Sequence, residues 1–235
     1  KVFGLFLSSG VIGSPDYTMD RINAVARILR YKHNFKGYIH LKVIPGASDA
    51  AIEDSMKLAS AVSLNIETPG KKRFDLLSDK KDYMNDIVRP LNLMSKLTMQ
   101  DQRFSRVKCT TQFIVGASDE PDSEIIESMF GIYRRLKFQR VYFSAYQKGL
   151  GHPDIPGEKR LLPNPQNIFM REHRLYQTDF LIRRYGFKNE DIVFDKSGNL
   201  SLDKDPKQIW ADTHPEFYPI KINSADKEAL LRVPG

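Results

Sequence analysis

Cysteine is nearly absent from this sequence. Its 235 residues include a single cysteine, Cys109. One thiol excludes an internal disulfide framework, and it excludes a zinc site or iron–sulfur cluster that draws several thiolates from this sequence. We expect Cys109 itself, which lies just before a strand-like run, to be an inert buried thiol.

Long apolar runs and common catalytic motifs are also missing. No run approaches the ~18–20 apolar residues that a membrane-spanning helix needs, so we expect no membrane partner and a cytoplasmic protein. The sequence has no G-x-S-x-G, H-E-x-x-H or Walker motif, and no G-x-G-x-x-G follows a strand. The five histidines are scattered without metal-ligand spacing, so no metal-binding residues are predicted.

Charge of one sign is in excess but is not concentrated. The formal net charge is +7, and both halves of the chain carry part of the excess. Such a balance permits an anionic partner without demonstrating one.

At both ends of the sequence, the residue pattern predicts an element that needs a further neighbouring element. Residues 1–7 form an apolar run that is typical of a buried strand with neighbours on both sides. Near the other end, Ser224 is expected to cap a helix over 225–232, and the Pro-Gly pair that follows is typical of a turn. We therefore expect further elements before and after this sequence.

Between the ends, strand-like runs alternate with segments of helical periodicity, which is typical of repeated βα units. Strands are predicted at 1–7, 38–43, 62–66, 110–115 and 140–145. The intervening helices are predicted at 19–31, after a Ser48 cap, near 82–97 and at 123–136. Same-direction strands with helical crossovers predict an α/β fold with a parallel sheet.

Four of these strands alternate between polar and apolar side chains. In 38–43, for example, Tyr38, His40 and Lys42 share one face and the intervening residues are apolar. Because an open parallel sheet is normally apolar on both faces, we predict a partial (β/α)6-type TIM-like barrel whose inner face lines a polar cavity. The alternative is a sheet with one face in water.

Polar residues gather where the predicted strands end, as in βα barrels with a ligand at that rim. This set suits a small zwitterionic or nucleoside ligand. It comprises Ser8, Ser9, Gly10, Lys42, Asn65, Glu67, residues 116–118, Ser144 and Tyr146.

Lys42 and His40 each allow two interpretations. A desolvated Lys42 inside a barrel would form a Schiff base, whereas a salt bridge to Glu67 would make it structural. His40 is expected to point inward with Lys42, either as a functional group or as a structural hydrogen-bonding group.

The chain is predicted to divide into three parts. Residues 1–146 form the barrel core, 147–221 a lid loop followed by helices, and 222–235 the start of a helix-hairpin-helix motif. In the middle part, 147–167 is rich in Pro and Gly, and helices are expected at 170–185 and 205–212.

Several strings in this sequence together resemble the DNA modification and repair branch of the radical S-adenosylmethionine (radical SAM) enzymes. They are residues 5–15 (LFLSSGVIGSP), 37–46 (GYIHLKVIPG), 63–67 (SLNIE), 111–117 (TQFIVGA), 141–146 (VYFSAY) and 171–177 (REHRLYQ). The likeness covers nearly the whole chain, and residues 222–235 resemble the first half of a helix-hairpin-helix motif.

The resemblance implies an S-adenosylmethionine site. Ser8, Ser9 and Gly10 stand where the family's GGE-like motif receives the methionine amino group, so a hydroxyl or carbonyl would replace the carboxylate. Asn65 and Glu67 match positions that contact ribose or carboxylate. The remaining implied cofactor contacts are Lys42 with the cofactor carboxylate, Ile114 and Gly116 on the adenine-contacting strand, and Gln112, Ser144 and Tyr146.

The resemblance also implies a 4Fe-4S cluster and further partners. The family's CxxxCxxC motif is missing, and its expected place lies upstream of residue 1, so we expect either a segment that this sequence lacks or a degenerate relative; we favour the first. The family cleaves S-adenosylmethionine to a 5′-deoxyadenosyl radical, with an electron donor such as flavodoxin or ferredoxin. The implied substrate is DNA or a nucleotide. The implied nucleic-acid-binding residues are Val233, Pro234 and Gly235, at a hairpin whose backbone amides grip a DNA phosphate in the family.

Two other functions stay open from the sequence. One is a Schiff-base barrel lyase that uses Lys42. The other is a non-catalytic DNA-binding module that binds no cofactor.

Overall fold

The structure is a computed structural model that describes residues 2–149, 151–159 and 166–234. The chain folds as two compact units. Unit 1 comprises residues 1–113 and 132–142, and unit 2 comprises residues 114–131 and 143–235. The three-part division expected from the sequence stays a prediction.

A five-stranded parallel sheet forms the framework, with the strands in the order β1-β2-β3-β4-β5. The strands are β1 (Gly4–Leu7), β2 (Tyr38–Lys42), β3 (Ala61–Ser63), β4 (Lys108–Val115) and β5 (Arg140–Ala145). Each strand therefore pairs with the next one along the chain, which is the order that successive βα units produce. The mixed α/β class and the parallel sheet predicted from the sequence are confirmed.

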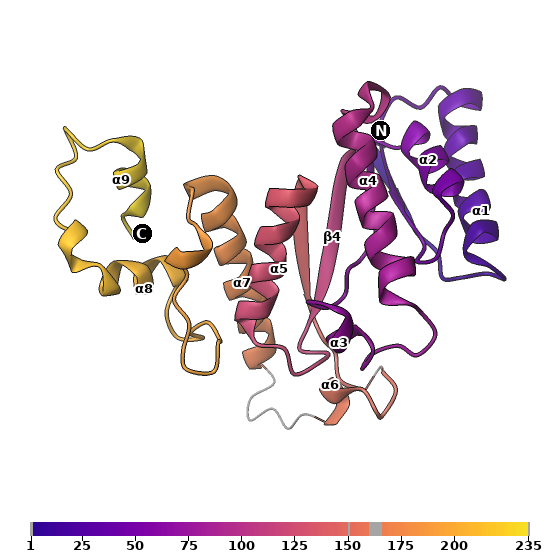
Figure 1. Cartoon of the computed structure of the whole chain (residues 1–235). Coiled ribbons are helices and arrows are strands. Elements are labelled where there is room, and N and C mark those ends of the chain that lie inside the picture. Colours follow the sequence, from indigo (N-terminus) through magenta and orange to yellow (C-terminus); the bar gives the residue numbers. More distant parts are fainter. Residues whose placement is uncertain (1, 150, 160–165, 235) are drawn as a thin grey trace. The chain divides into compact units, whose positions relative to one another are not determined.

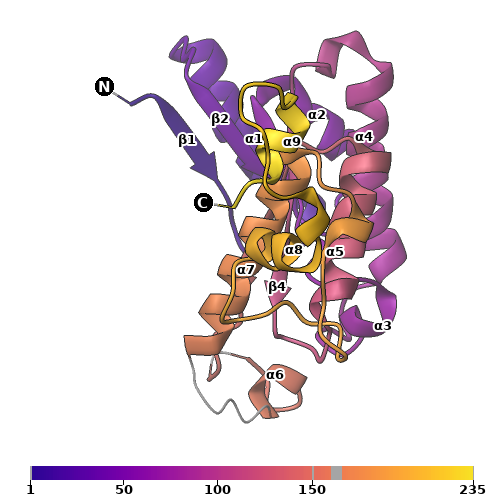
Figure 2. The ribbon, with the colours of Figure 1, turned by 90° about the vertical axis from the view of Figure 1, so that its left-hand side faces the viewer.

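The helices of unit 1 lie between these strands in the sequence. They are α1 (Pro15–Arg27), η1 (Ile28–Lys32), α2 (Asp49–Leu58), α3 (Lys71–Phe74), η2 (Tyr83–Val88), α4 (Arg89–Gln100), η3 (Gln102–Phe104) and η4 (Ile132–Leu136). Figure 1 and Figure 2 show α1 beside α2, and α2 also contacts α4.

Side-chain caps explain where the first helices begin. Ser48 Oγ accepts a hydrogen bond from Ala51 N, so the predicted cap of α2 is confirmed. The helix predicted to start at Met19 begins earlier, at Pro15, because Ser14 accepts from Tyr17 N. Proline is well suited to the first helical position, since it has no amide hydrogen to leave unpaired.

The core of unit 1 lies on the apolar face of the sheet. Ile39 and Leu41 of β2 and Val62 of β3 are fully buried, together with Ile52 of α2 and Met94 of α4. The predicted alternation in β2 is thus confirmed, because the intervening residues Tyr38, His40 and Lys42 are not in this core.

Strand β1 differs from the expectation of a buried strand with two neighbours. Its sequence neighbours Val2 and Phe3 are 62% and 77% exposed, and Phe6 within it is 58% exposed. The reason is that β1 pairs only with β2, so it lies at the edge of the sheet. The predicted strand is confirmed at Gly4–Leu7, but among the described residues it has one neighbour and is exposed, so its burial between two neighbours stays a prediction.

Unit 2 is mainly helical. Its helices are α5 (Asp122–Gly131), α6 (Pro156–Lys159), α7 (Gln166–Tyr185), η5 (Asn189–Asp191), α8 (Pro206–Thr213), η6 (Pro215–Phe217) and α9 (Lys227–Arg232). Helix α7 packs against α5, α8 and α9. The predicted lid loop at 147–167 contains α6, and its residues 150 and 160–165 lie outside the described residues.

The last helix begins two residues later than expected. Asp226 is its N-cap and accepts from Ala229 N at 2.7 Å, so the expectation that Ser224 caps it is wrong. Ser224 instead closes a turn through its amide, which donates to Lys221 O. The side chain of Arg232 holds α9 in place, stacking on Phe187 and Trp210 at 3.9 and 4.6 Å from their ring centroids.

Among the described helices, none is both long enough and apolar enough to cross a membrane.

Candidate functional site

The polar face of the sheet in unit 1 encloses a cavity of about 250 Å³. Because Ile39 and Leu41 enter the core, the pleat of β2 turns His40 and Lys42 to the opposite face. Side chains from all five strands or from the residue segments directly after them contribute to this cavity. It is lined by Phe6, His40, Lys42, Ser63, Asn65, Thr110, Thr111, Gln112 and Tyr142.

Asn65 connects the two charged side chains of this region. The Lys42 ammonium donates a hydrogen bond to Asn65 Oδ1. The Asn65 side chain is also hydrogen-bonded to the Glu67 carboxylate. Among the ion pairs of the described residues, none joins Lys42 to Glu67, so the salt bridge that was one of the two interpretations of Lys42 is not formed and Asn65 lies between the two groups.

Burial shifts the pKa values of both charged groups toward neutrality. It lowers the pKa of Lys42, and the nearby Glu67 charge opposes that shift. Burial likewise raises the pKa of Glu67, against the charges of Lys42 and Lys81 and the hydrogen bond from Asn65. An ammonium and a carboxylate in such surroundings gain most from ligand groups of opposite charge.

The backbone at Glu67 adopts a left-handed conformation with φ of +66°. This region is unfavourable for a residue other than glycine and is concentrated at ligand sites. The turn is held by Glu67 N, which donates to Gln112 O at 3.0 Å, and by a bridge to Phe113. Strand β3 accordingly ends at Ser63, earlier than the predicted strand, and the chain bends as it passes the cavity.

Three polar atoms in this region are buried without a hydrogen-bond partner. They are His40 Nε2, Thr110 Oγ1 and Glu67 Oε2. An unpaired buried polar group costs about 1–3 kcal/mol, and such groups in native proteins ordinarily bind a ligand or water. These three atoms and the Lys42 ammonium are therefore able to hydrogen-bond a polar ligand or water.

The imidazole of His40 is held neutral. Its pKa is lowered first by burial and then by the charge of Lys42. The ring of Phe6 packs edge-on against it, with the centroids 4.8 Å apart. These surroundings favour the neutral form of the His40 imidazole.

Only part of the predicted set lies in this cavity. Lys42, Asn65 and Gln112 line it, and Glu67 is joined to it through Asn65. Ser8 and Ser9 line a separate hollow of about 190 Å³ with Thr18 and Arg21. The expectation that Ser8, Ser9 and Gly10 share one site with Lys42 is thus not met by the cavities of unit 1.

The other predicted residues belong to unit 2. Ser144 is exposed, and Ile114 is half-buried at the end of β4. Tyr146 donates to Glu158 at 2.6 Å, and burial together with this bond raises the pKa of Tyr146 to about 12. Gly116 has a φ of +85° and donates its amide hydrogen to Glu120 Oε1 at 2.6 Å.

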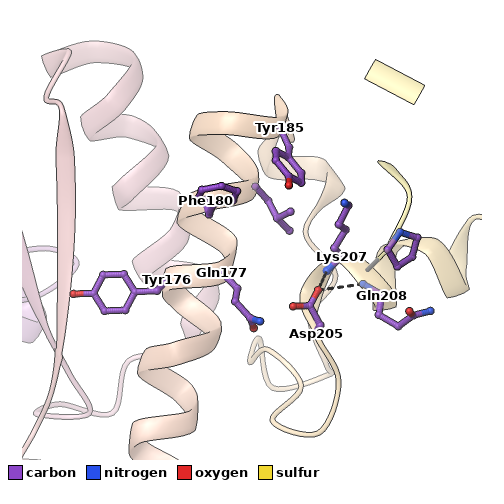
Figure 3. Close-up of a pocket in the computed structure, with 9 residues that line it drawn as sticks. Tyr176, Gln177, Phe180, Tyr185, Asp205, Lys207 and Gln208 are labelled. Carbon is purple, nitrogen blue, oxygen red and sulfur yellow. Dashed lines mark hydrogen bonds between the residues drawn. The ribbon is translucent and has the colours of Figure 1, made fainter. Parts of the chain in front are cut away.

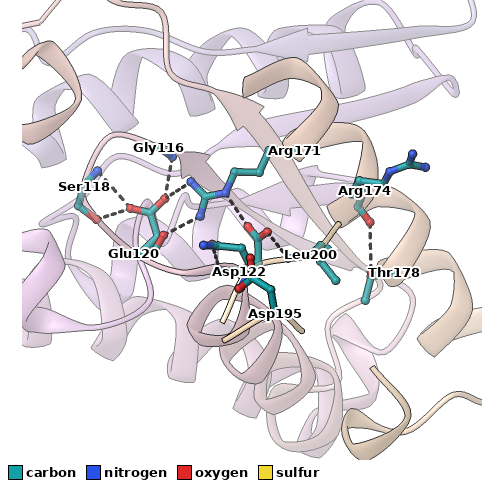
Figure 4. Close-up of polar contacts among 10 residues, drawn as sticks. Gly116, Ser118, Glu120, Asp122, Arg171, Arg174, Thr178, Asp195 and Leu200 are labelled. Carbon is teal, nitrogen blue, oxygen red and sulfur yellow. Dashed lines mark hydrogen bonds and ion pairs between the residues drawn. The ribbon is translucent and has the colours of Figure 1, made fainter. Parts of the chain in front are cut away.

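A buried ionic network holds the turn that contains Gly116 (Figure 4). Glu120 accepts from Gly116 N, Ser118 N and Ser118 Oγ. Arg171 of α7 donates to Asp122 Oδ1 at 2.6 Å and to Glu120 O at 2.6 Å, and it pairs with Glu120 Oε1 at 3.4 Å. Sequence reasoning missed this network, because no short-range pattern links Glu120 and Asp122 to a residue about 50 positions away.

Cavity-lining residues that the predicted set did not include are Phe6, Ser63, Thr110, Thr111 and Tyr142. Most of them could have been found by extending the alternation that identified Lys42, since Ser63, Thr110 and Tyr142 lie on the polar faces of their strands.

The three residues predicted to bind nucleic acid do not form a described hairpin. Val233 is 40% exposed, Pro234 lines a cavity of unit 2, and Gly235 lies outside the described residues.

The residues of this sequence do not fit an iron–sulfur cluster. Cys109 is buried, and burial raises its pKa to about 12, so its thiolate form is disfavoured. Within the described residues, no group of three or more His, Cys, Asp or Glu side chains is arranged to hold a metal ion.

Comparison with protein-family models, with curated proteins and with solved structures gives no match for this chain. The site must therefore be interpreted from its own geometry.

Proposed function

We propose that the chain is the cofactor-binding part of a radical SAM enzyme and that the cavity of unit 1 binds S-adenosylmethionine. The observation that carries this proposal is the half-buried ammonium of Lys42 beside three buried polar atoms that have no hydrogen-bond partner. A zwitterionic amino-acid group is the ligand that would satisfy both signs of charge at once.

The cavity volume defines which part of the cofactor it holds. At about 250 Å³ it is smaller than the ~300–1,000 Å³ of pockets that enclose a whole drug-sized ligand. We therefore assign to it the methionine part, with the carboxylate bound by Lys42 and the amino group by Glu67 and Asn65. His40 Nε2 and Thr110 Oγ1 then hydrogen-bond the remaining polar atoms.

We also propose a fold and a set of partners for this enzyme. The strand order in which each strand pairs with the next, and the polar cavity on one face of the sheet, support a partial TIM-like barrel. A helix-hairpin-helix beginning at α9, a DNA or nucleotide substrate and a flavodoxin or ferredoxin electron donor are parts of the proposal that rest on the resemblance alone. The residues of this sequence do not themselves supply the ligands of the 4Fe-4S cluster.

Calorimetric titration of the chain with S-adenosylmethionine tests the proposal. Lys42→Met, which keeps the apolar stem and removes the charge, should weaken binding at least tenfold, because a charge-assisted hydrogen bond contributes about 1.5–3 kcal/mol. Lys96→Met, on the exposed surface of α4, is the matched control and should bind as the wild type does. Absence of saturable binding by the wild type, or equal binding by Lys42→Met, would refute it.

The lowered pKa of Lys42 favours one second candidate, a Schiff-base lyase. The neutral amine would attack a carbonyl carbon, lose water and leave an imine that borohydride reduces to a stable secondary amine. Incubation with pyruvate and borohydride, followed by peptide mass spectrometry, would then show an adduct on Lys42 in the wild type and none in Lys42→Met. The S-adenosylmethionine proposal predicts no adduct.

A further inference from the structure

A second and larger cavity, of about 530 Å³, lies in unit 2 between α7 and the start of α8 (Figure 3). Its volume falls within the range of pockets that enclose a small organic ligand. Phe180 and Tyr185 of α7 give it aromatic walls, and Gln177, Asp205 and Lys207 give it polar ones. None of these residues belongs to the cavity of unit 1.

Lys207 provides a positive charge that makes no close ion pair. No ion pair of the described residues includes it, and its Nζ lies 4.5 Å from the centroid of the Tyr185 ring. Partial burial lowers its pKa, although the charge of Asp205 opposes this shift. A partly desolvated ammonium of this kind binds an anionic group more strongly than an exposed lysine does.

The start of α8 fixes the position of Lys207. Asp205 Oδ1 caps the helix by accepting from Lys207 N at 2.8 Å and from Gln208 N at 3.4 Å. The described hydrogen bonds to the Asp205 side chain use only Oδ1, so Oδ2 keeps its capacity to accept from a ligand.

Facing Asp205 in Figure 3 is Gln177, which extends from α7. Its Oε1 accepts from Arg174 at 2.8 Å, which orients the amide and directs its NH₂ group away from Arg174. No described hydrogen bond uses that NH₂ group, so a donor and the acceptor of Asp205 face one another across the cavity. This pair matches the polar edge of a nucleobase, which presents donors and acceptors side by side.

The aromatic wall supplies a stacking surface. Phe180 is 46% exposed, and its ring makes a T-shaped contact with Tyr185, with the centroids 5.2 Å apart. Stacking on an exposed aromatic ring is the common way in which proteins hold unpaired bases.

We propose that this cavity binds a nucleoside monophosphate unit, with the base on Phe180 and between Gln177 and Asp205, and the phosphate on Lys207. This inference gives the proposed nucleotide substrate a site, and it does not depend on the cavity of unit 1. The unit is either a free nucleotide or one residue of a single-stranded DNA.

Calorimetric titration with dAMP, adenosine, inorganic phosphate and a short single-stranded oligonucleotide tests this site. Wild-type protein should bind dAMP or the oligonucleotide in a saturable way, and adenosine at least fivefold more weakly than dAMP. Binding of the oligonucleotide alone would identify DNA as the source of the unit, and binding of dAMP alone would identify the free nucleotide. Absence of binding to both, or phosphate binding as tight as dAMP binding, would overturn the proposal.

Variants separate this site from the rest of the chain. Lys207→Met and Phe180→Leu should each weaken dAMP or oligonucleotide binding about tenfold, whereas Lys221→Met, an exposed lysine of unit 2, should not. Titration of Lys42→Met with S-adenosylmethionine and titration of Lys207→Met with dAMP test different cavities, so failure of the S-adenosylmethionine proposal and failure of this one are distinguishable. Equal binding by Lys207→Met and wild type, with both folded by circular dichroism, would refute the role of Lys207.

Discussion

At the scale of single residues, alternation along β2 decides the chemistry of the cavity. Ile39 and Leu41 are fully buried in the core, and this leaves His40 and Lys42 on the opposite face, where burial lowers the pKa of each. Both residues therefore favour their neutral forms more than they would in water. Protonation of either one in the folded chain is less favourable than in the unfolded chain, so it lowers the free energy of unfolding.

The lowered pKa of His40 predicts a dependence of stability on pH. Below its ordinary pKa of 6.5, the unfolded chain binds a proton that the folded chain resists, so the free energy of unfolding should fall as the pH drops through 6.5. His40→Gln should remove this contribution. On acidification, the urea concentration at the midpoint of unfolding should then fall less for His40→Gln than for the wild type.

Glu67 acts in the opposite direction, because its raised pKa makes the folded chain bind a proton more readily than the unfolded chain above 4.5. The comparison of His40→Gln with wild type isolates the histidine, since Glu67 is common to both. His33→Gln, at an exposed histidine of unit 1, serves as the control and should keep the wild-type slope. A wild-type slope in His40→Gln would contradict the assignment.

At the scale of elements, helix α7 is positioned by charge as well as by apolar packing. Arg171 is 8% exposed, and Glu120 and Asp122 are each 1% exposed. Asp122 also accepts from Leu200 N at 2.9 Å, so the network joins α5, α7 and the segment before α8. Its members satisfy one another, and the removal of one leaves buried charge without compensation.

Arg171→Met should accordingly destabilise the protein by about 3–5 kcal/mol, measured by urea unfolding. Arg184→Met, an exposed position on the same helix, should change stability by less than about 0.5 kcal/mol. A small effect of Arg171→Met would show that Glu120 and Asp122 find other partners or water.

At the scale of the whole molecule, both halves of the sequence carry part of the net charge of +7. One basic residue near the end of the chain is also engaged within unit 2. Arg232 pairs with Asp191 at 3.1 Å and stacks on two aromatic rings, so its guanidinium contributes to folding. A non-catalytic module that binds DNA through this end of the chain would have to do so mainly through other groups.

Single-stranded DNA binding should therefore depend weakly on salt. A contact to one or two phosphates gives a slope of about −0.7 to −1.4 in a plot of log affinity against log salt, and Lys207→Met should reduce the slope by about 0.7. Fluorescence anisotropy of a labelled oligonucleotide over a series of salt concentrations measures it. A slope steeper than about −4 would indicate a broad basic surface and contradict this expectation.

The sequence by itself determined the local features of this protein. Periodicity and capping chemistry predicted the order of strands and helices, the Ser48 cap and the alternation of polar and apolar side chains along β2. These features depend on neighbours a few residues apart. The same alternation placed Lys42, His40 and Asn65 on the polar face of the sheet, where the cavity lies.

Tertiary structure alone decided which of those residues meet. It left β1 at an edge and therefore exposed, placed Ser8 and Ser9 in a different hollow from Lys42, and inserted Asn65 between Lys42 and Glu67. It also joined Arg171 to Glu120 and brought α8 alongside α7, where the larger cavity lies. These outcomes depend on strand pairing and helix packing between distant segments, for which a local pattern carries no information.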